Sequence, residues 1–266
     1  MKVPRILPHS AWPLLACLLL VAAGCRSRGG DVLRVAVTPG PAEEILRAVE
    51  PQLASQGVQL RIVTFSDYVQ PDMALASREV DANLYQNMVF LNQFNHDHAT
   101  RFVSLGKVYL PLMALYPGRA KSIAALANGA RIAIPNDPVN HDRALLLLEG
   151  AGLLQLAHHP DASPAQVALN PKQIKLVELD AAQLPRSLDD VDAAVINANF
   201  ALDAGLNPQS GVLFSEKRDS PYANVLSVNA ETQADSHARA LAAALASPAA
   251  RSFITAHYGG AIYPAE

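Results

Sequence analysis

The stretch RIAIPNDPVNHDRALLLLEGAGLL, residues 131–154, carries the pattern that decides the fold. Arg131 to Ile134 alternate in character and predict a short strand, which the Pro135-Asn136-Asp137-Pro138 cluster breaks. Ala144 to Leu154 is then a good helix former. A strand, a polar turn and a helix start that follow one another directly are typical of an α/β fold.

The polar turn is also the first candidate for a binding site. Asn136, Asp137 and Asn140 are residue types that cap helices. A helix start leaves about four backbone N–H groups unpaired at the positive end of a dipole, which favours an anion. Arg143 adds a planar donor fork that suits a carboxylate. The alternative is a turn and cap with a solvated surface Arg, which is the commoner case.

The N-terminus predicts export and lipidation. Two basic residues precede an apolar run from Ala11 to Ala23, and small residues stand directly before Cys25. These are the features of a secretory signal peptide, and the small residues before Cys resemble a bacterial lipobox. We expect a lipoprotein signal peptide at 1–24, an acylated Cys25 and a polar tether at 25–31. The alternative is an ordinary signal peptide that happens to contain Cys25.

The composition narrows the class of protein. The chain has 24 acidic and 21 basic residues, a net charge of -3, and both signs mixed throughout, so nothing indicates a nucleic-acid partner. The only other cysteine, Cys17, lies in the segment to be removed, so the mature chain has no possible disulfide. No later apolar run is long enough to span a membrane. Roughly 235 residues remain, enough for one large or two smaller cores.

The same order of elements occurs twice. The first half reads strand, helix, strand, short helix, strand, at Leu33–Val37, Ala42–Leu53, Leu60–Phe65, Pro71–Ser77 and Asp81–Tyr85. Strands of the same type recur at Arg131–Ile134, Ile174–Leu179 and Asp192–Ile196. The same tripeptide, Val-Asp-Ala, lies at the start of the third strand of each unit, at Val80-Asp81-Ala82 and Val191-Asp192-Ala193. The order predicts parallel strands and two α/β lobes, although all βαβ units share such patterns.

Two segments are candidates for crossings between the lobes. Lys107 to Tyr116 is an extended run with Pro111 at its middle, which favours an edge or hinge strand. Gly211 to Asn229 predicts two strands joined by a polar turn, and a helical tail follows at 235–258, broken only at Ser247-Pro248. The tail would pack back on the first lobe, which gives lobe 1 at 32–112 and 222–266, and lobe 2 at 113–221.

A ligand cleft is expected between these lobes. Ligands of open α/β sheets bind outside the carboxyl ends of the strands. In this chain those ends carry polar or aromatic residues, at Thr38–Pro41, Ser66–Tyr68, Tyr85–Asn87, Asn136–Arg143 and Asn197–Phe200. Because all five strand ends carry such residues, a ligand site at the polar turn of residues 131–154 becomes a stronger prediction.

Several separate motifs follow one another along the chain. They are Phe65-Ser66-Asp67-Tyr68 with Pro71, Asp81-Ala82-Asn83, Pro135-Asn136-Asp137-Pro138 through Asn140 and Arg143-Ala144-Leu145, Pro185-Arg186-Ser187-Leu188-Asp189-Asp190, Ala194-Val195-Ile196-Asn197, and Asp219-Ser220-Pro221-Tyr222. Together they resemble the NlpA/MetQ lipoproteins, methionine-binding components of ABC importers, from Leu33 to about Tyr258. The resemblance implies a type-2 periplasmic binding protein fold, with two α/β lobes, a hinge and an interlobe ligand cleft.

The resemblance also implies roles for individual residues. Arg143 would clamp the carboxylate of the ligand with Asn140 beside it, Asn197 would reach its amino and carboxylate groups, and Tyr68 would line the cleft. Physical chemistry agrees with these roles. A zwitterion that enters a closing cleft loses its water, and each charge that finds no partner in the cleft costs several kcal/mol of desolvation free energy. Amide oxygens accept from an ammonium without adding a full charge.

The chain departs from the family pattern where the side chain of the ligand would lie. After Asp-Ala-Asn it carries Tyr85, Gln86, Asn87 and Phe90, where the family typically shows an aromatic residue, Gln, His and later Tyr. Further departures are Val139, His141-Asp142, Tyr109 and Pro111. We assign Tyr85, Asn87 and Tyr109 to the ligand site with the residues above. We expect an intact α-amino-acid clamp and an altered side-chain pocket.

Other constellations give no second site. Asn95-His96-Asp97-His98 has metal-ligand residue types, but histidines two positions apart do not share a helix face, and the stretch reads as a polar loop. His158-His159 before Pro160 also reads as a loop. We expect no metal and no cofactor. The mature chain has no Gly-x-Ser-x-Gly elbow, no Cys nucleophile and no phosphate-binding Gly-rich loop, so an enzyme ranks lowest.

The leading hypothesis is a lipid-anchored solute-binding protein of the cell envelope. It would bind D- or L-methionine between its lobes and deliver it to the permease and ATPase complex of an ABC importer, held to the membrane by its N-terminal lipid. One alternative is another amino acid, a dipeptide or an amino-acid-like ligand. A second is a surface lipoprotein with a vestigial cleft.

Overall fold

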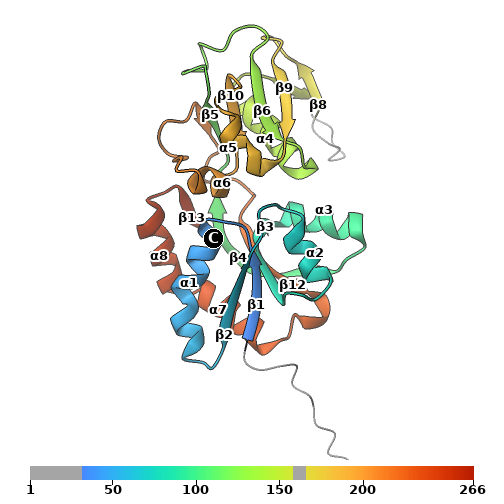
Figure 1. Cartoon of the computed structure of the whole chain (residues 1–266), viewed down its shortest axis with the longest axis vertical. Helices are drawn as coiled ribbons and strands as arrows, with labels where there is room; N and C mark the ends of the chain where they lie inside the picture. Colours follow the sequence, from blue (N-terminus) through green and yellow to red (C-terminus); the bar gives the residue numbers. More distant parts are fainter. Residues whose placement is uncertain (1–31, 158–165) are drawn as a thin grey trace, which may run out of the picture. The chain divides into compact units, whose positions relative to one another are not determined.

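A computed structural model of the chain describes residues 32–157 and 166–266. The predicted signal peptide, the tether with Cys25, and the His158-His159 pair lie outside the described residues. Within the described ranges, none of the helices combines the length and the apolar character needed to cross a bilayer. We call each of the two large sheets, together with the helices packed on it, a lobe (Figure 1).

Six strands form the sheet of the first lobe, in the order β13-β4-β12-β3-β1-β2. They are β1 (Val32–Val37), β2 (Gln59–Thr64), β3 (Ala82–Asn87), β4 (Phe102–Pro111), β12 (Asn224–Asn229) and β13 (Ile262–Pro264). β1 pairs in parallel with β2 and β3, whereas β12 is antiparallel to both β3 and β4. The predicted parallel order of the first three strands is confirmed.

Five strands form the sheet of the second lobe, in the order β11-β5-β10-β6-β9. They are β5 (Ala114–Pro117), β6 (Arg131–Pro135), β9 (Lys175–Leu179), β10 (Ala193–Ile196) and β11 (Phe214–Ser215). β6 is parallel to β9 and β10, as β1 is to β2 and β3. A separate pair joins β7 (Gln155–Ala157) to β8 (Gln166–Leu169). The repeat in the sequence is therefore a repeat of structure.

Helices pack on both faces of each sheet (Figure 1). The first lobe has α1 (Pro41–Ala54), α7 (Ser236–Leu245) and α8 (Pro248–Tyr258) on one face, and α2 (Gln70–Ala76) and α3 (Met88–His98) on the other. The second lobe has α4 (Pro138–Gly150) on one face, and α5 (Leu184–Ser187) and α6 (Ala198–Asp203) on the other. Short 3₁₀ turns lie at Ala181–Gln183 and Ala230–Thr232.

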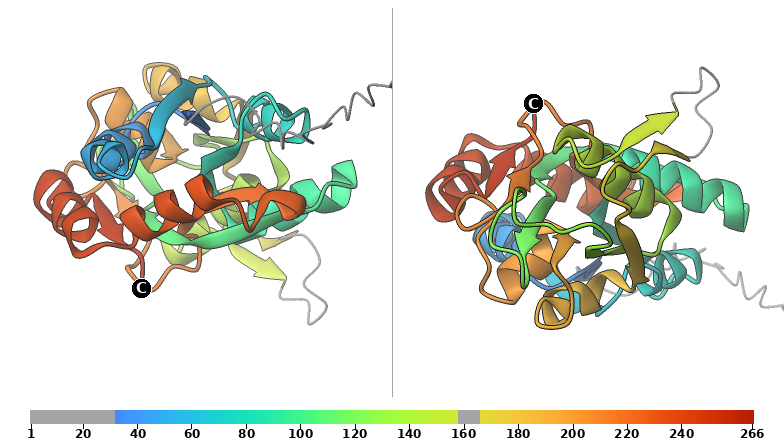
Figure 2. Two further views of the ribbon diagram at one scale, coloured as in Figure 1. Left: turned by 90° about the horizontal axis from the view of Figure 1, so that it is seen from below. Right: turned by 90° about the horizontal axis from the view of Figure 1, so that it is seen from above.

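The helical tail packs on the first lobe, as predicted from the second crossing. α7 contacts α1 and β4, and α8 contacts α1 and β13, so both C-terminal helices lie beside the first helix of the chain (Figure 2). Alternate side chains of each strand enter opposite cores. Val35 and Val37 of β1 face α1, α7 and α8, whereas Ala36 faces α2 and α3.

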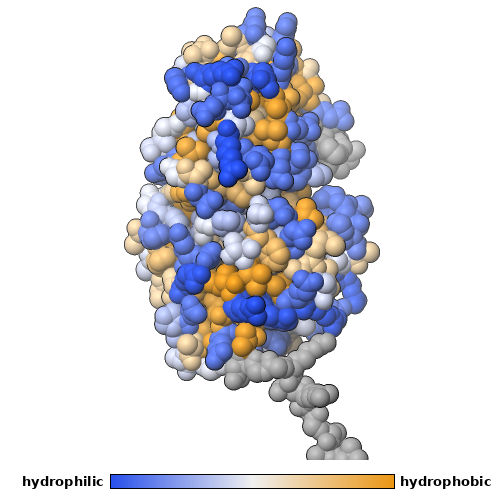
Figure 3. Space-filling model, in the orientation of Figure 1, coloured by the Kyte–Doolittle hydropathy of each residue, from blue (hydrophilic) through white to orange (hydrophobic). Residues whose placement is uncertain are grey.

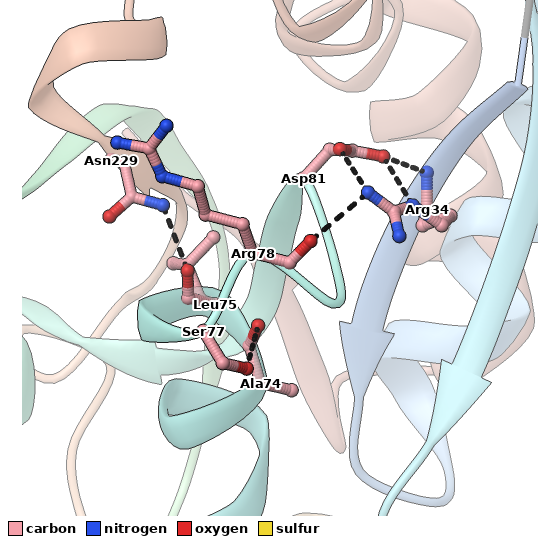
Figure 4. A network of polar contacts seen from close by, with 7 residues as sticks. All are labelled: Arg34, Ala74, Leu75, Ser77, Arg78, Asp81 and Asn229. Atoms are coloured by element: carbon pink, nitrogen blue, oxygen red, sulfur yellow. Dashed lines mark hydrogen bonds and ion pairs between the residues drawn. The ribbon is translucent and has the colours of Figure 1, made fainter. Parts of the chain in front are cut away.

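The repeated Val-Asp-Ala letters have the same structural role in both lobes. A carboxylate oxygen of Asp81 accepts from the backbone N–H of Arg34 at 2.9 Å, and Asp192 accepts from that of Arg131 at 2.7 Å. The backbone N–H of each Asp donates in return to the carbonyl of the same Arg. In the first lobe the Arg34 guanidinium adds bonds to Asp81 and to the carbonyl of Arg78 (Figure 4).

Strand β2 forms one edge of the first sheet. Leu60 and Ile62 are only half-buried, and Figure 3 shows hydrophobic surface where Figure 1 draws β1 and β2. Arg61 between them is exposed. A charge on an edge strand opposes pairing with another chain.

Three elements differ from the sequence predictions. Lys107 to Tyr116 is two strands, because β4 ends at Pro111 in one sheet and β5 begins at Ala114 in the other. Helix α4 begins at Pro138, ahead of the apolar run, because the Asp137 carboxylate caps the N–H of Asn140. The stretch Asn95 to His98 was predicted as a loop and is the end of α3. The apolar ring of Phe94, which stacks on Phe102, fixes that turn to the core.

Candidate functional site

A cavity lies where residues of both lobes meet. The space between its wall atoms is about 340 Å³ when the solvent at its open side is counted. Polar and aromatic side chains make up most of its wall, which consists of Tyr68, Tyr85, Gln86, Asn87, Phe90, Pro111, Asn140, Arg143, Asn197, Ala198, Asn199 and Asn224. The predicted strand ends other than Thr38 to Pro41 therefore converge on one cavity.

Arg143 is buried on α4, with 3% of its side chain exposed. Its Nε and Nη2 atoms donate to the two carboxylate oxygens of Glu216 at 2.7 and 2.6 Å, and Nη2 also donates to the carbonyl of Pro111 at 2.8 Å. The guanidinium lies over the ring of Tyr222, with 4.4 Å between its Cζ atom and the ring centroid. Nη1 has no partner among the described residues. Arg143 thus presents one free donor group and is already neutralised by a carboxylate of the chain itself.

A line of amides runs from the start of α4 to the start of α6. The Asn140 Nδ2 donates to both oxygens of Asp137 at 3.0 Å, and the Asn140 Oδ1 accepts from the Asn197 Nδ2 at 2.8 Å. Burial raises the pKa of Asp137, and the bonds from Asn140 oppose that rise. The Asn197 Oδ1 is buried and has no partner among the described residues. Asn140 therefore orients Asn197, a residue of the cavity wall that has an unused acceptor.

Aromatic rings form the apolar part of the wall. Tyr68 and Tyr85 stack at 5.9 Å between ring centroids, and Phe90 meets both rings edge-on at 6.1 and 5.9 Å. Phe200 packs against Tyr68 from the other lobe at 5.1 Å. Burial raises the pKa of both tyrosine hydroxyls, so they are neutral donors at physiological pH. Such a wall suits an apolar or thioether group, because sulfur packs favourably on aromatic rings.

The end of β3 and the start of β12 complete the first-lobe wall. The Asn87 Oδ1 caps α3 by accepting from the backbone N–H groups of Val89 and Phe90. The Asn224 Nδ2 donates to the carbonyl of Tyr85 at 2.7 Å and to the hydroxyl of Tyr109 at 2.9 Å. Tyr109 is 1% exposed and is not among the lining residues. Its hydroxyl is linked to the cavity wall by the hydrogen bond from Asn224.

Asn199 joins the two lobes directly. Its Oδ1 accepts from the Tyr68 hydroxyl at 2.6 Å, and its Nδ2 donates to the Thr38 hydroxyl at 3.3 Å. Gly40 approaches the same segment with φ of +95°, and a Cβ there would lie 3.2 Å from the backbone oxygen of Asn199. The cavity is therefore bounded by contacts that can exist only while the lobes are together.

The structure brings six of the seven predicted ligand residues to the cavity wall and leaves Tyr109 behind it. Sequence reasoning gave no role to Glu216, Asn199 or Asn224. Asn199 has a signal in the sequence, because it lies two residues after Asn197 in the polar and aromatic segment that follows the strand β10. Within the described residues, no group of three or more His, Cys, Asp or Glu side chains is arranged to hold a metal ion.

The model of the NlpA lipoprotein family matches residues 33–266. A relative from Salmonella typhi, the D-methionine-binding lipoprotein MetQ, is 38% identical over 219 residues, 80% of each chain.

Two solved structures are also similar. A nutrient binding protein from Burkholderia cenocepacia, solved bound to methionine, has a TM-score of 0.84 at 37% identity and covers 88% of this chain and 100% of its own. A periplasmic substrate-binding protein of an ABC transporter from Coxiella burnetii has a TM-score of 0.83 at 43% identity, with the same coverage. The two-lobe binding-protein fold predicted from the motifs is confirmed, and the chain belongs to the NlpA lipoprotein family.

Proposed function

We propose that this chain is a solute-binding protein that captures methionine between its two lobes and delivers it to a membrane ABC importer. One observation carries the proposal. The same cavity has polar groups without a partner in the described part of the chain, which suit the two charges of a zwitterion, and a wall of aromatic side chains. Relatives named for D-methionine binding and for an ABC transporter support the same reading.

The charges of the cavity suit a ligand that is neutral overall. Arg143 is balanced by Glu216, so a net anion or cation would leave one charge unmet on burial. We assign the ligand carboxylate to the Nη1 side of Arg143 and the ammonium to the unpartnered oxygens of Asn197 and Gln86. Asn140 acts by orienting Asn197.

The side chain of the ligand is assigned to the aromatic wall. Tyr68, Tyr85 and Phe90 would contact it, and Asn87 holds Phe90 in place through the helix cap. Tyr109 would act through Asn224. Closure of the lobes would bury the ligand, and the ligand need only prefer the closed state to drive it.

The lobe boundaries also belong to this proposal. Residues 32–112 and 222–266 would move as one lobe, and 113–221 as the other. The change of sheet between Pro111 and Ala114, and again between Ser215 and Asn224, supports hinges at these two places.

Ligand identity is tested directly on purified protein. Mass spectrometry of the ligand released on unfolding is expected to find methionine, and calorimetry on a panel of L- and D-amino acids is expected to rank methionine first. Tight binding of a different amino acid would support the residues assigned to the α-amino and carboxylate groups and would change the identity of the ligand. No binding by any α-amino acid would refute the proposal.

We propose that a lipid on Cys25 anchors the protein to a membrane of the cell envelope, with the folded domain facing the periplasm or the cell exterior. A relative of the chain is named as a membrane lipoprotein, which supports the assignment. Cys25→Ala is expected to move the protein from the membrane fraction to the soluble fraction on centrifugation, with ligand binding unchanged. A Cys25→Ala protein that stays in the membrane would contradict the lipid anchor.

A further inference from the structure

Asp72 is a fully buried carboxyl group directly behind the wall of the cavity. Its Oδ2 lies 2.7 Å from the hydroxyl of Tyr85, and its Oδ1 lies 2.8 Å from the Nε2 of Gln86 and 2.5 Å from the Nδ2 of Asn83. Tyr85 and Gln86 both line the cavity. Asp72 therefore fixes the direction of two wall side chains without reaching the cavity itself.

The hydroxyl of Tyr85 has two oxygen neighbours and only one proton. It lies 2.7 Å from Oδ2 of Asp72 and 2.8 Å from the backbone carbonyl oxygen of Tyr68. A hydroxyl donates one hydrogen bond, and an ionised carboxylate only accepts. With Asp72 ionised, one of these two short contacts would therefore join two acceptors with no hydrogen between them.

One more proton removes this conflict. If Oδ2 of Asp72 is protonated, it donates to the Tyr85 oxygen, and the Tyr85 hydroxyl donates to the carbonyl of Tyr68. Oδ1 then remains a carbonyl oxygen, which accepts from the amide N–H groups of Asn83 and Gln86. Every short contact of the carboxyl group becomes a donor–acceptor pair.

In the part of the chain that the structure describes, no counter-ion lies beside Asp72. Helix α2 packs on β1, β3 and β12. The Arg34 guanidinium on β1 is engaged by Asp81 and the carbonyl of Arg78 (Figure 4), and β12 carries no charged residue. The other titratable groups of these elements and of the segments next to α2 are Tyr68, Tyr85, Asp67 and the exposed Arg78 and Glu79. An ionised Asp72 would be a buried charge with hydrogen bonds but no counter-charge, which is costly.

We propose that Asp72 is protonated on Oδ2 in the folded protein at acidic pH, well above the range in which a free Asp ionises, and that this neutral acid is a positioning residue for Tyr85 and Gln86. The protonation does not depend on the identity of the ligand, whereas the effect on binding rests on the proposed function. Burial independently raises the pKa of Asp72 to about 7, because desolvation outweighs the hydrogen bonds from Tyr85, Asn83 and Gln86.

The sign of the pH dependence follows from linkage. The folded protein holds the proton more tightly than the unfolded chain, whose Asp titrates near 3.9. The stability contributed by this group is therefore complete below about pH 4, falls as the pH rises to about 7, and is level above that. Asparagine reproduces the neutral acid, because its Oδ1 accepts as the carbonyl does and its Nδ2 donates to Tyr85 as the acid proton does.

The test compares wild type with Asp72→Asn and Asp72→Leu. The Tm of Asp72→Asn minus that of wild type is expected to grow between about pH 4 and pH 7 and then stay level. Infrared spectra of wild type below pH 7 are expected to contain a protonated carboxyl band that Asp72→Asn lacks. A Tm difference that does not change with pH, or the absence of that band, would overturn the proposal.

Binding provides the second readout. The affinity of wild type for methionine is expected to fall several-fold from about pH 6 to pH 8, whereas Asp72→Asn keeps the low-pH affinity throughout and Asp72→Leu binds weakly at every pH. Equal pH profiles for wild type and Asp72→Asn would remove the positioning role. If none of the three proteins binds methionine, the proposed function fails, while the Tm and infrared measurements still decide whether Asp72 carries the proton.

Discussion

Replacing Arg143 with alanine is expected to weaken methionine binding by at least about 2 kcal/mol, roughly 30-fold in Kd, measured by calorimetry. The guanidinium is 3% exposed, and its Nη1 has no partner among the described residues. A ligand carboxylate bound there makes a charge-assisted hydrogen bond to a buried guanidinium, and such bonds are strongest where water is excluded. Alanine offers no donor to replace it.

The double variant Arg143→Ala with Glu216→Ala separates affinity from stability. Arg143→Ala alone also leaves the mostly buried Glu216 carboxylate, 11% exposed, without its counter-charge, so the single variant is expected to unfold more readily. Removing both charges should recover part of the lost stability, since the pair as a whole contributes less than either partner costs when left alone. Affinity should not recover. An unchanged Kd in Arg143→Ala would exclude Arg143 from the ligand site.

The sequence predicts most of the fold, because the fold rests on local patterns that occur twice. Short alternating or apolar runs become strands, and the breakers between them become the loops at the cavity. The repeated Val-Asp-Ala tripeptide has a structural reason, since its Asp, Asp81 or Asp192, holds the last strand of its unit to the first. The wrong prediction at residues 95–98 arose because polar residue types outweighed one buried aromatic residue, Phe94.

The candidate site could be predicted only in part. Asn140, Arg143 and Asn197 stand at strand ends or helix starts, where a local pattern marks them. Glu216 is 73 residues from Arg143 along the chain, and the pairing of β11 with β5, directly before Glu216, brings the two together. The direction of Tyr109 depends on the register of β4 against β12 near Asn224, which has an irregularity that no local pattern reveals.

Glu216→Ala is expected to lower the free energy of unfolding of the ligand-free protein by about 3–5 kcal/mol, because it leaves a buried guanidinium without a counter-charge. The backbone N–H of Met113, which donates to Glu216 at 2.9 Å, also loses its acceptor. Chemical denaturation measures the change. Glu79→Ala, at an exposed glutamate, is the matched control and should stay within about 0.5 kcal/mol of wild type.

The ligand should then stabilise Glu216→Ala more than it stabilises wild type. Without Glu216 the ligand carboxylate takes the place of the counter-charge of Arg143, whereas in wild type the two share one guanidinium. The position of Arg143 should survive, because the Pro111 carbonyl and the Tyr222 ring still hold it. Saturating methionine is therefore expected to raise the Tm of Glu216→Ala by more than that of wild type, as tighter binding to the folded state requires. A smaller Tm rise would mean that Glu216 is needed to aim Arg143 at the ligand, and that orientation outweighs charge in this cavity.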